Sequence, residues 1–369
     1  MDFIETCIQR IISVVLSLVR LVSAKEGVAM WPVLEILWDI FMSWRFSREP
    51  GRECERDLNG RVVVVTGANA GIGKDTAAYL WERGADVVMA CRSRERATAA
   101  RNDIIAAARA RGTGSEASRL VLMDLDLASL TSVRNFASEF NERYERLDIL
   151  VLNAGLLGVP RTVTEDGNEL LFQVHHVGHF LLTMLLLQAL RKAAEGDGPK
   201  PRVVVVSSIL SKMGTVDLDN LNFTKGGYNR NAAYANSKLH NVLFMRELHR
   251  RVFPQYGIHV NACHPGNIVT DVTRNLPKIW GISQKRLQQS VGFFFRNPLE
   301  GAATQIRMAV ASELEGVSGK MFCDYNLEMP LTPSGKDYSL ASALWKESVK
   351  ICGLAPEQIP PPLQDLVLR

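Results

Sequence analysis

The 369-residue chain contains only six cysteines, and they are widely spaced. None belongs to a C-x-x-C pair or to a cluster of cysteine and histidine, so the sequence offers no recognisable metal site. Isolated cysteines of this kind are typical of reduced thiols in an intracellular compartment. They stand at Cys7, Cys54, Cys91, Cys263, Cys323 and Cys352.

Charge is also sparse. Charged residues make up 22% of the chain and the net charge is +4, which is too small and too scattered to indicate a nucleic-acid-binding protein. The hydrophobic share is 47%, as in globular rather than disordered proteins. A chain of this length can form one large domain with an appendage, or two ordinary domains.

The first 48 residues lack an uninterrupted transmembrane segment. Arg10 and Arg20 interrupt the apolar stretch 4–22, and the charge-free run 11–19 is shorter than the roughly 20 residues that a spanning helix needs. At about 100° per residue, the polar side chains of this stretch gather on one side and the aliphatic ones on the other. Pro32 suits the first turn of a second amphipathic helix.

Tryptophans and arginines accompany these two helices, as in segments that lie in a membrane interface. We expect residues 1–48 to form a helical extension that binds the surface of the endoplasmic reticulum or another organelle. Alternatively, the helices pack on the protein's own surface or on a second copy in a homodimer, and the protein is cytoplasmic. A cleaved signal peptide is a further alternative, which Asp2 and Glu5 oppose. The tryptophans are Trp31, Trp38 and Trp44.

Residues 49–58 are charged and are predicted to be a linker, whereas residues 59–369 alternate between strands and helices. Short apolar runs are typical of strands buried on both faces of a parallel sheet. The order predicts an α/β fold with a doubly wound parallel sheet of the Rossmann type. The predicted strands are Val62–Thr66, Asp86–Ala90, Leu120–Met123, Ile149–Leu152, Val203–Ser207 and His259–Cys263, and helices are predicted at Lys74–Arg83 and Arg94–Arg109.

A glycine-rich turn, TGANAGIG, joins the first predicted strand to the first helix. Its glycines let the backbone turn sharply and approach a pyrophosphate, which binds at the positive end of the helix. The preceding valine-rich strand gives this pattern its required context. We therefore expect a dinucleotide to contact this turn and the ends of the third and fourth strands. The expected contacts are Gly67, Asn69, Gly71, Ile72, Gly73, Asp124, Asn153, Ala154 and Gly155.

The residues after the second predicted strand distinguish NAD from NADP. An acidic residue there would bind the ribose hydroxyls of NAD, but this chain has Ala90-Cys91-Arg92. An arginine can pair with the 2′-phosphate of NADP, and Lys74 and Arg94 place positive charge nearby. The sequence therefore predicts NADP(H), unless Arg92 is an ordinary solvated arginine.

Of the seven tyrosines, only Tyr234 is followed four residues later by a lysine, Lys238. Residues spaced in this way share one face of a helix. A phenol with an unperturbed pKa of about 10 exchanges protons poorly near neutrality, and an adjacent ammonium lowers that pKa. Ser207 and Ser208 end a strand, where a hydroxyl can bind the reacting oxygen. A Tyr-Lys pair is usually a surface contact. Far more specific is the order along the chain of the glycine turn, Asn-Ala-Gly, Ser-Ser, Tyr-x-x-x-Lys and Pro265-Gly266.

From about Gly60 to about Tyr325 the chain resembles the short-chain dehydrogenase/reductase family. Within it, the chain is similar to the retinol-dehydrogenase-like branch and to the catalytic domain of the WW-domain-containing oxidoreductases. The resemblance rests on TGANAGIGK, ACRSRERA, PRVVVVSS, NSKLHNVLFMRELHRR, HPGNIVT and GAATQIRMAVASELEGVSGKMF. It implies an oxidoreductase acting on CH–OH groups with NADP(H).

The resemblance also implies individual roles. Ser208 orients the substrate oxygen, Tyr234 transfers the proton, and Lys238 lowers the pKa of the tyrosine and holds the nicotinamide ribose. Asn153 lines the cofactor cleft. The nicotinamide carboxamide is positioned by the segment that contains Pro265, Gly266 and Thr270.

One position departs from the family pattern, because His175 stands where the family usually has asparagine. That asparagine serves a proton relay, largely through its main-chain carbonyl and a water bound to the lysine. A histidine keeps the carbonyl, so the relay can survive. A direct catalytic role for His175 is the alternative.

The segment between Thr270 and Glu300 is where this family builds its substrate lid. Its apolar residues favour a lipophilic substrate, a retinoid, steroid or fatty aldehyde. One rival hypothesis is an interaction or scaffold protein on a degenerate dehydrogenase fold, which His175 favours and Tyr234 and Lys238 oppose. Another is an epimerase or dehydratase of the extended branch, which normally has a longer C-terminal domain. The apolar lid residues are Leu276-Pro277, Ile279-Trp280 and Phe293-Phe294-Phe295.

Overall fold

The computed structural model describes residues 54–113, 118–266, 268, 297–324, 327–356 and 364–365. The segments of the two predicted N-terminal helices, Thr270 and the apolar lid residues lie outside this described part, so the predictions made for them stay predictions.

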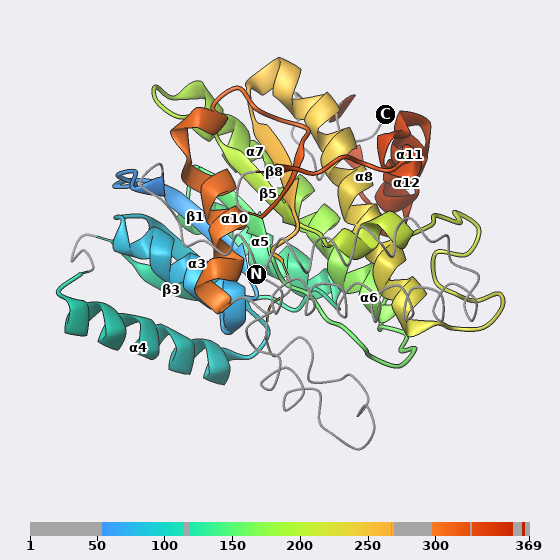
Figure 1. Ribbon diagram of the computed structural model, residues 1–369, viewed down its shortest axis with the longest axis horizontal. Helices are drawn as coiled ribbons and strands as arrows, with labels where there is room; N and C mark the ends of the chain where they lie inside the picture. Colours follow the sequence, from blue (N-terminus) through green and yellow to red (C-terminus); the bar gives the residue numbers. More distant parts are fainter. Residues whose placement is uncertain are drawn as a thin grey trace, which may run out of the picture.

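An eight-stranded sheet forms the centre of the molecule and confirms the predicted doubly wound α/β fold (Figure 1). The strand order is β3-β2-β1-β4-β5-β6-β7-β8, all neighbours pairing parallel except β7 and β8. The order reverses between β1 and β4, which is where ligands bind in such sheets. The strands are β1 Val62–Thr66, β2 Asp86–Cys91, β3 Leu120–Asp124, β4 Ile149–Leu152, β5 Arg202–Val206, β6 His259–Cys263, β7 Met321–Cys323 and β8 Leu327–Glu328.

Helices cover both faces of the sheet because successive strand residues point to opposite sides. In β1, Val63 and Val65 pack in one buried cluster with α3, α4 and α10, and Val62 and Val64 pack in another with α5, α7, α8 and α12. The longer helices are α3 Gly71–Glu82, α4 Arg94–Arg111, α5 Leu130–Arg143, α7 Gly178–Glu195, α8 Arg230–Tyr256, α10 Pro298–Val310 and α12 Tyr338–Ile351. The short ones are α6 Leu170–Phe172, the π-helix η2 Gln173–Val177, the 3-10 helices η3 Ile209–Met213 and η6 Ser312–Leu314, and α11 Pro333–Lys336.

Among the described residues, one continuous helical stretch, Leu170–Glu195, is long and apolar enough to cross a membrane. Most of it is buried inside the domain. Phe180 and Leu187, for example, are fully buried in the cluster between the sheet and helices α5, α7, α8 and α12. The length and apolar character of this stretch are therefore those of a core helix.

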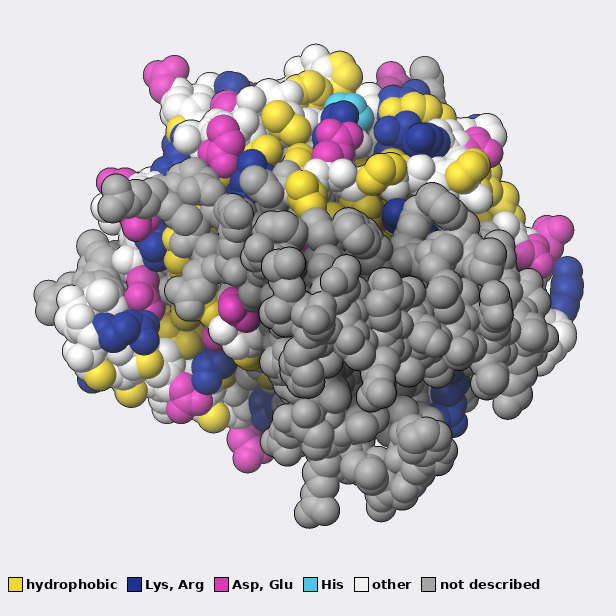
Figure 2. Space-filling view, viewed as in Figure 1, with side chains coloured by type: hydrophobic (Ala, Val, Ile, Leu, Met, Phe, Trp, Pro, Cys, Tyr) yellow, Lys and Arg dark blue, Asp and Glu magenta, His cyan; other side chains and the backbone are white. Residues whose placement is uncertain are grey.

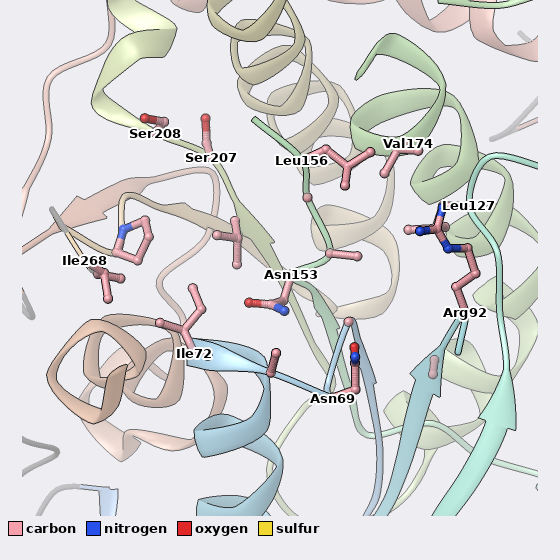
Figure 3. Close-up of a pocket in the computed structure, with 18 of the residues that line it drawn as sticks. Asn69, Ile72, Arg92, Leu127, Asn153, Leu156, Val174, Ser207, Ser208 and Ile268 are labelled. Carbon is pink, nitrogen blue, oxygen red and sulfur yellow. The ribbon is translucent and has the colours of Figure 1, made fainter. Parts of the chain in front are cut away.

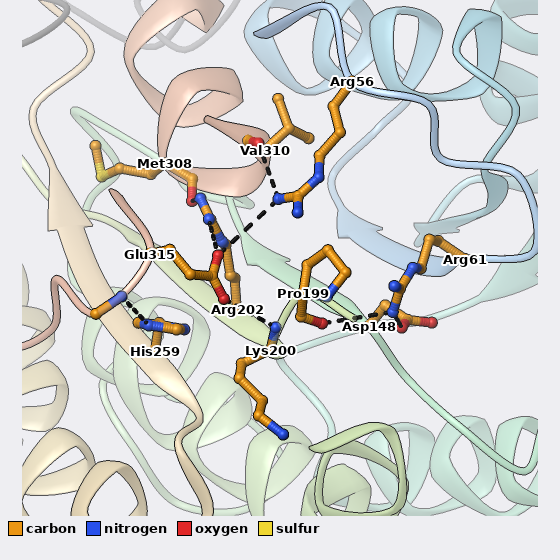
Figure 4. Close-up of polar contacts among 11 residues, drawn as sticks. Arg56, Arg61, Asp148, Pro199, Lys200, Arg202, His259, Met308, Val310 and Glu315 are labelled. Carbon is orange, nitrogen blue, oxygen red and sulfur yellow. Dashed lines mark hydrogen bonds and ion pairs between the residues drawn. The ribbon is translucent and has the colours of Figure 1, made fainter. Parts of the chain in front are cut away.

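The amino ends of the strands are held by ion pairs (Figure 4). Arg61 binds the buried carboxylate of Asp148 at 2.7 Å, and the same carboxylate accepts the Val62 N–H at 2.9 Å. The buried guanidinium of Arg202 reaches Glu315 at 2.7 Å. These contacts stabilise the amino ends of the strands, whereas ligands bind at the carboxyl ends.

The end of the predicted linker packs on the domain. Cys54 is fully buried and Leu58 is 3% exposed, both in the α3–α4–α10 cluster. The packed part of the chain therefore includes residues from Cys54 onward, a few residues before the expected start at residue 59. Over the face in Figure 2, lysine and arginine side chains lie among aspartates and glutamates.

Candidate active site

A cleft of about 310 Å³ opens at the carboxyl ends of the central strands, where the strand order reverses (Figure 3). Arg92 lies on one side of it and Ser208 on the other. The predicted site residues that line the cleft are Gly67, Asn69, Gly71, Ile72, Arg92, Asn153, Ala154, Gly155, Ser208, Tyr234, Lys238, Pro265 and Gly266. Gly73, Asp124 and His175 do not line it.

The glycine turn has the shape that a pyrophosphate site requires. Gly67 and Gly71 have φ values of +68° and +52°, a region that favours glycine. A Cβ on Gly73 would stand 2.4 Å from Asn153 Nδ2 and 2.5 Å from the Gly67 carbonyl oxygen. Gly73 therefore serves the close approach of α3 to the turn rather than contact with the cleft. The first turn of α3 contains no acidic residue, so its positive end is available for an anion.

At the other end of the cleft, two arginines are brought together at the start of α4. Arg92 and Arg96 line the cleft, and the Ser93 hydroxyl between them caps α4 by accepting the Arg96 N–H. Sequence inspection missed Arg96, although its position in the first turn of the predicted helix placed it near Arg92.

Lys74 and Arg94 were expected to add positive charge here, but neither lines the cleft and each pairs with a carboxylate. Lys74 Nζ pairs with Asp103 at 2.8 Å, and Arg94 reaches Asp124 at 3.5 Å and the Leu122 carbonyl at 3.1 Å.

The acidic residue expected after the third strand is also corrected. Asp124 is the last residue of β3, is exposed and pairs with Arg94. The cleft is lined instead by Asp126 together with Leu125 and Leu127. The Asp126 carboxylate caps the following turn by accepting the Ala128 N–H at 3.0 Å. The D-x-D spacing in the sequence did not reveal which carboxylate faces the cleft.

Ser208, Tyr234 and Lys238 converge on one wall of the cleft. Ser208, which follows β5, forms a side-chain hydrogen bond with Tyr234. Lys238 lies one turn along α8, 5.7 Å from the centre of the Tyr234 ring, and its Nζ donates to the Val206 carbonyl at 3.0 Å. The Ser207 hydroxyl donates to the Lys238 carbonyl at 2.8 Å, which ties the strand end to α8.

The pKa of Tyr234 is shifted in the opposite direction from the one expected from the sequence. Burial raises the pKa of Tyr234 to about 12, opposed by the hydrogen bond from Ser208. Burial also lowers the pKa of Lys238 to about 8. Desolvation of the phenolate therefore outweighs the Ser208 hydrogen bond, and Tyr234 holds its proton at neutral pH.

His175 lies behind this wall and is fully buried. Its Nε2 accepts the Leu156 N–H at 2.8 Å, and its Nδ1 lies 2.8 Å from the Ser237 hydroxyl. Burial, and next the charge of Lys238, lower its pKa well below the usual value. Both ring nitrogens are hydrogen-bonded, and the ring does not line the cleft.

The main-chain carbonyl of His175, expected to hold a relay water, accepts a hydrogen bond from His179 Nδ1 at 3.1 Å. The other nitrogen of His179 lies 2.9 Å from the Thr66 hydroxyl at the end of β1. Thr66 Oγ1 in turn accepts the N–H groups of Asn153 and Ala154 at 2.9 and 3.0 Å. The histidines of this stretch thus join β1, the turn after β4 and α8.

Two more histidines are buried nearby, His176 of the π-helix and His240 of α8. His176 Nε2 lies 2.7 Å from the Ser348 hydroxyl of α12. His240, 3% exposed, packs edge-on against Phe172 and His176, and neither of its ring nitrogens has a hydrogen-bond partner in the described structure. Burial lowers the pKa of His240 to about 3.

Known proteins with similar sequences belong to the short chain dehydrogenases. The family model of the short chain dehydrogenases matches residues 61–279. Retinol dehydrogenase 14 of Mus musculus is 41% identical over 318 residues, covering 85% of this chain and 92% of the relative. The WW domain-containing oxidoreductase of Danio rerio is 39% identical over 307 residues, covering 80% and 69%.

Many solved structures share the fold, and two of them show the extent of the likeness. An uncharacterised protein of Mycobacterium paratuberculosis superposes with a TM-score of 0.61 at 31% identity, covering 83% of this chain and 96% of that one. The NADP complex of RhlG from Pseudomonas aeruginosa has a TM-score of 0.54 at 25% identity, covering 73% and 96%. The glycine turn and the cleft fit a nicotinamide dinucleotide.

The buried histidines predict a loss of stability in acid. Because the pKa of His240 is about 3 in the folded protein and about 6.5 when unfolded, His240 takes up a proton on unfolding below pH 6.5. The titration of His240 does not change the free energy of unfolding above that pH. Below it, the titration lowers this free energy by about 1.4 kcal/mol per pH unit. His240→Leu removes a buried ring without partners, so we expect the free energy of unfolding to rise by about 1 kcal/mol at pH 7.5 and to fall less between pH 7 and 5.

Urea unfolding of the full chain at several pH values measures both effects. His176→Leu is the matched control, because it loses a bonded ring and should lower stability at pH 7.5. A His240→Leu variant that is less stable than wild type and equally acid-sensitive would show that the ring is satisfied in solution.

Proposed function

The chain belongs to the short-chain dehydrogenase/reductase family and is an oxidoreductase related to the retinol dehydrogenases, and from this premise we propose a specific reaction. The protein interconverts a lipophilic alcohol and its aldehyde or ketone with NADP(H) as cofactor. The substrate belongs to the retinoid, steroid or fatty aldehyde class. The observation that carries the proposal is the convergence of Ser208, Tyr234 and Lys238 on one wall of a cleft that extends to Arg92.

The reduced cofactor, when bound, supplies the hydride that a carbonyl carbon accepts. The chain's own residues then manage the oxygen. The Ser208 hydroxyl, already bonded to Tyr234, is placed to bind the carbonyl oxygen as negative charge develops on it. The Tyr234 phenol donates its proton to that oxygen and the product is the alcohol. Oxidation runs the same steps backwards, with the Tyr234 phenolate accepting the proton of the alcohol.

The raised pKa of Tyr234 keeps the phenol protonated at neutral pH, which is the form that carbonyl reduction requires. Lys238 is 4% exposed and points its ammonium at the Val206 carbonyl. From there it can hold a ribose hydroxyl of the cofactor while its charge favours the tyrosinate.

NADP(H) is proposed over NAD(H) because of the two arginines at the start of α4. Arg92 and Arg96 both line the end of the cleft next to Ala90, the position after which NAD-binding sheets carry an acid. A guanidinium binds a phosphate through two parallel hydrogen bonds. The Ser93 side chain, already capping α4, completes a polar end of the cleft.

The amphipathic N-terminal residues lead to a proposal about location. We propose that residues 1–48 lie on an organelle membrane and place the cleft near a lipophilic substrate, with residues 49–53 joining them to the packed domain. Homodimer formation through the same helices is the alternative.

The first prediction concerns the proton donor. Tyr234→Phe keeps the ring but removes the acid, so kcat for carbonyl reduction should fall about 10²- to 10⁴-fold while the Kd for NADPH changes less than threefold. Lys238→Met should lower kcat and also weaken NADPH binding. In the wild type, the reduction rate should stay level near neutral pH and decline above about pH 8, where Lys238 loses its proton.

Steady-state rates with retinal, a steroid ketone and a fatty aldehyde, combined with tryptophan fluorescence titration, measure these effects. Substantial turnover by Tyr234→Phe would assign the proton to another residue. A wild type that binds NADPH but reduces none of the three carbonyls would favour a scaffold protein on a dehydrogenase fold.

The second prediction concerns cofactor choice. Arg92→Asp replaces a charge-assisted contact with a repulsion, so the Kd for NADPH should rise about 10- to 100-fold and that for NADH much less. Arg94→Asp is the matched control, because Arg94 faces Asp124 instead of the cleft. Isothermal titration of wild type and both variants with each cofactor measures the six dissociation constants. Equal weakening of the two cofactors by Arg92→Asp would refute the assignment of the 2′-phosphate to Arg92.

The third prediction concerns the membrane. Deleting residues 1–48 leaves Cys54 and Leu58 in place, so the truncated protein should remain folded and move from the membrane pellet to the supernatant. Fractionation at low salt and circular dichroism measure this. Full-length protein in the low-salt supernatant would exclude the membrane role.

A further inference from the structure

We propose that His175 is a positioning residue, which fixes the Tyr234 turn of α8 against the turn that follows β4. It does so through a chain of hydrogen bonds from Leu156 through the imidazole and Ser237 to the Tyr234 main chain. The inference rests on the proposed function, since it assigns His175 a part in placing the proton donor.

The direction of every hydrogen bond in this chain is determined by its partners. The Leu156 N–H can only donate, so His175 Nε2 accepts and carries no proton. The Ser237 hydroxyl donates its proton to the Tyr234 carbonyl at 2.7 Å. Its oxygen is therefore free to accept from His175 Nδ1, 2.8 Å away. One neutral tautomer satisfies all three contacts.

The location of the ring suits a clamp and not a reactant. His175 is fully buried and Ser237 is 1% exposed, and neither lines the cleft. The imidazole meets the Tyr234 ring edge-on, with centres 5.7 Å apart. A Cβ on Gly155 would lie 3.3 Å from His175 Nε2 and 3.7 Å from Lys238 Nζ. The imidazole thus supports the cleft wall from behind, immediately next to the lysine.

The main chain of His175 joins the same support to β1. Because the His175 carbonyl accepts from His179 Nδ1, the other nitrogen of His179 accepts the Thr66 hydroxyl proton. Thr66 holds the Asn153 and Ala154 N–H groups. One turn of π-helix therefore sets the spacing between the proton donor and the strand ends that would hold the nicotinamide. Buried hydrogen bonds of this kind are costly to leave unmade.

The test compares His175→Phe, His175→Asn and Ser237→Ala in the full-length protein. His175→Phe fills the space but breaks both hydrogen bonds, so we expect kcat to fall about 10- to 100-fold through misplacement of Tyr234, with KM values within threefold. Hydrogen exchange of the Leu156 amide should become at least tenfold faster. His175→Asn keeps an acceptor and a donor and should restore both readouts at least in part. His176→Phe, an equally buried neighbour that faces Ser348, is the control and should keep the wild-type kcat.

A double-mutant cycle between His175 and Ser237 tests the proposal most directly. If His175 acts on Tyr234 through Ser237, the double variant His175→Phe/Ser237→Ala should lose no more kcat than the more impaired single variant. Losses that multiply, a wild-type kcat in His175→Phe, or an Asn variant as impaired as the Phe variant would each overturn the proposal. Should the wild type reduce no carbonyl, the proposed function fails. The exchange of the Leu156 amide in His175→Phe and His175→Asn still decides whether the clamp exists.

Discussion

The Thr66 hydroxyl bridges the one place where the strand order reverses, and the arrangement of the site depends on that bridge. At the reversal, β1 and β4 lead their helices to opposite faces, and a crevice is left between their ends. Thr66, the last residue of β1, accepts the first two N–H groups after β4 and lies against His179 of α7. The glycine turn, the Asn-Ala-Gly turn and the π-helix are thereby held in one frame.

Burial then sets the chemistry of the groups in that frame. The same desolvation raises the pKa of Tyr234 and lowers that of Lys238, so both groups are biased toward their uncharged forms. A bound dinucleotide would bring its own charges and hydroxyls to Lys238. The protein alone thus holds an acid that keeps its proton, as reduction of a carbonyl requires.

Much of this could be predicted from the sequence, because the signals were local. Valine-rich runs marked strands buried on both faces, and the glycine turn and the Tyr234–Lys238 spacing identified two parts of the cleft lining. The errors came from side-chain direction. Asp124 and Asp126 are two residues apart, but the strand ends between them and only Asp126 faces the cleft.

The π-helix could not be predicted either, because no sequence signal marked it. It turns His175 toward Ser237 of α8 and His176 toward Ser348 of α12. Lys74 and Arg94 were taken from the pattern by charge alone, whereas nearby carboxylates hold them.

The most direct test of the central claim follows the hydride itself. NADPH carrying deuterium at C4, on each face in turn, would be incubated with the full-length protein and retinal, a steroid ketone or a fatty aldehyde. We expect that one of the two labelled cofactors delivers deuterium to the carbinol carbon of at least one product, and that labelled NADH does so far more slowly. Bound NADPH that leaves every carbonyl free of deuterium would contradict it.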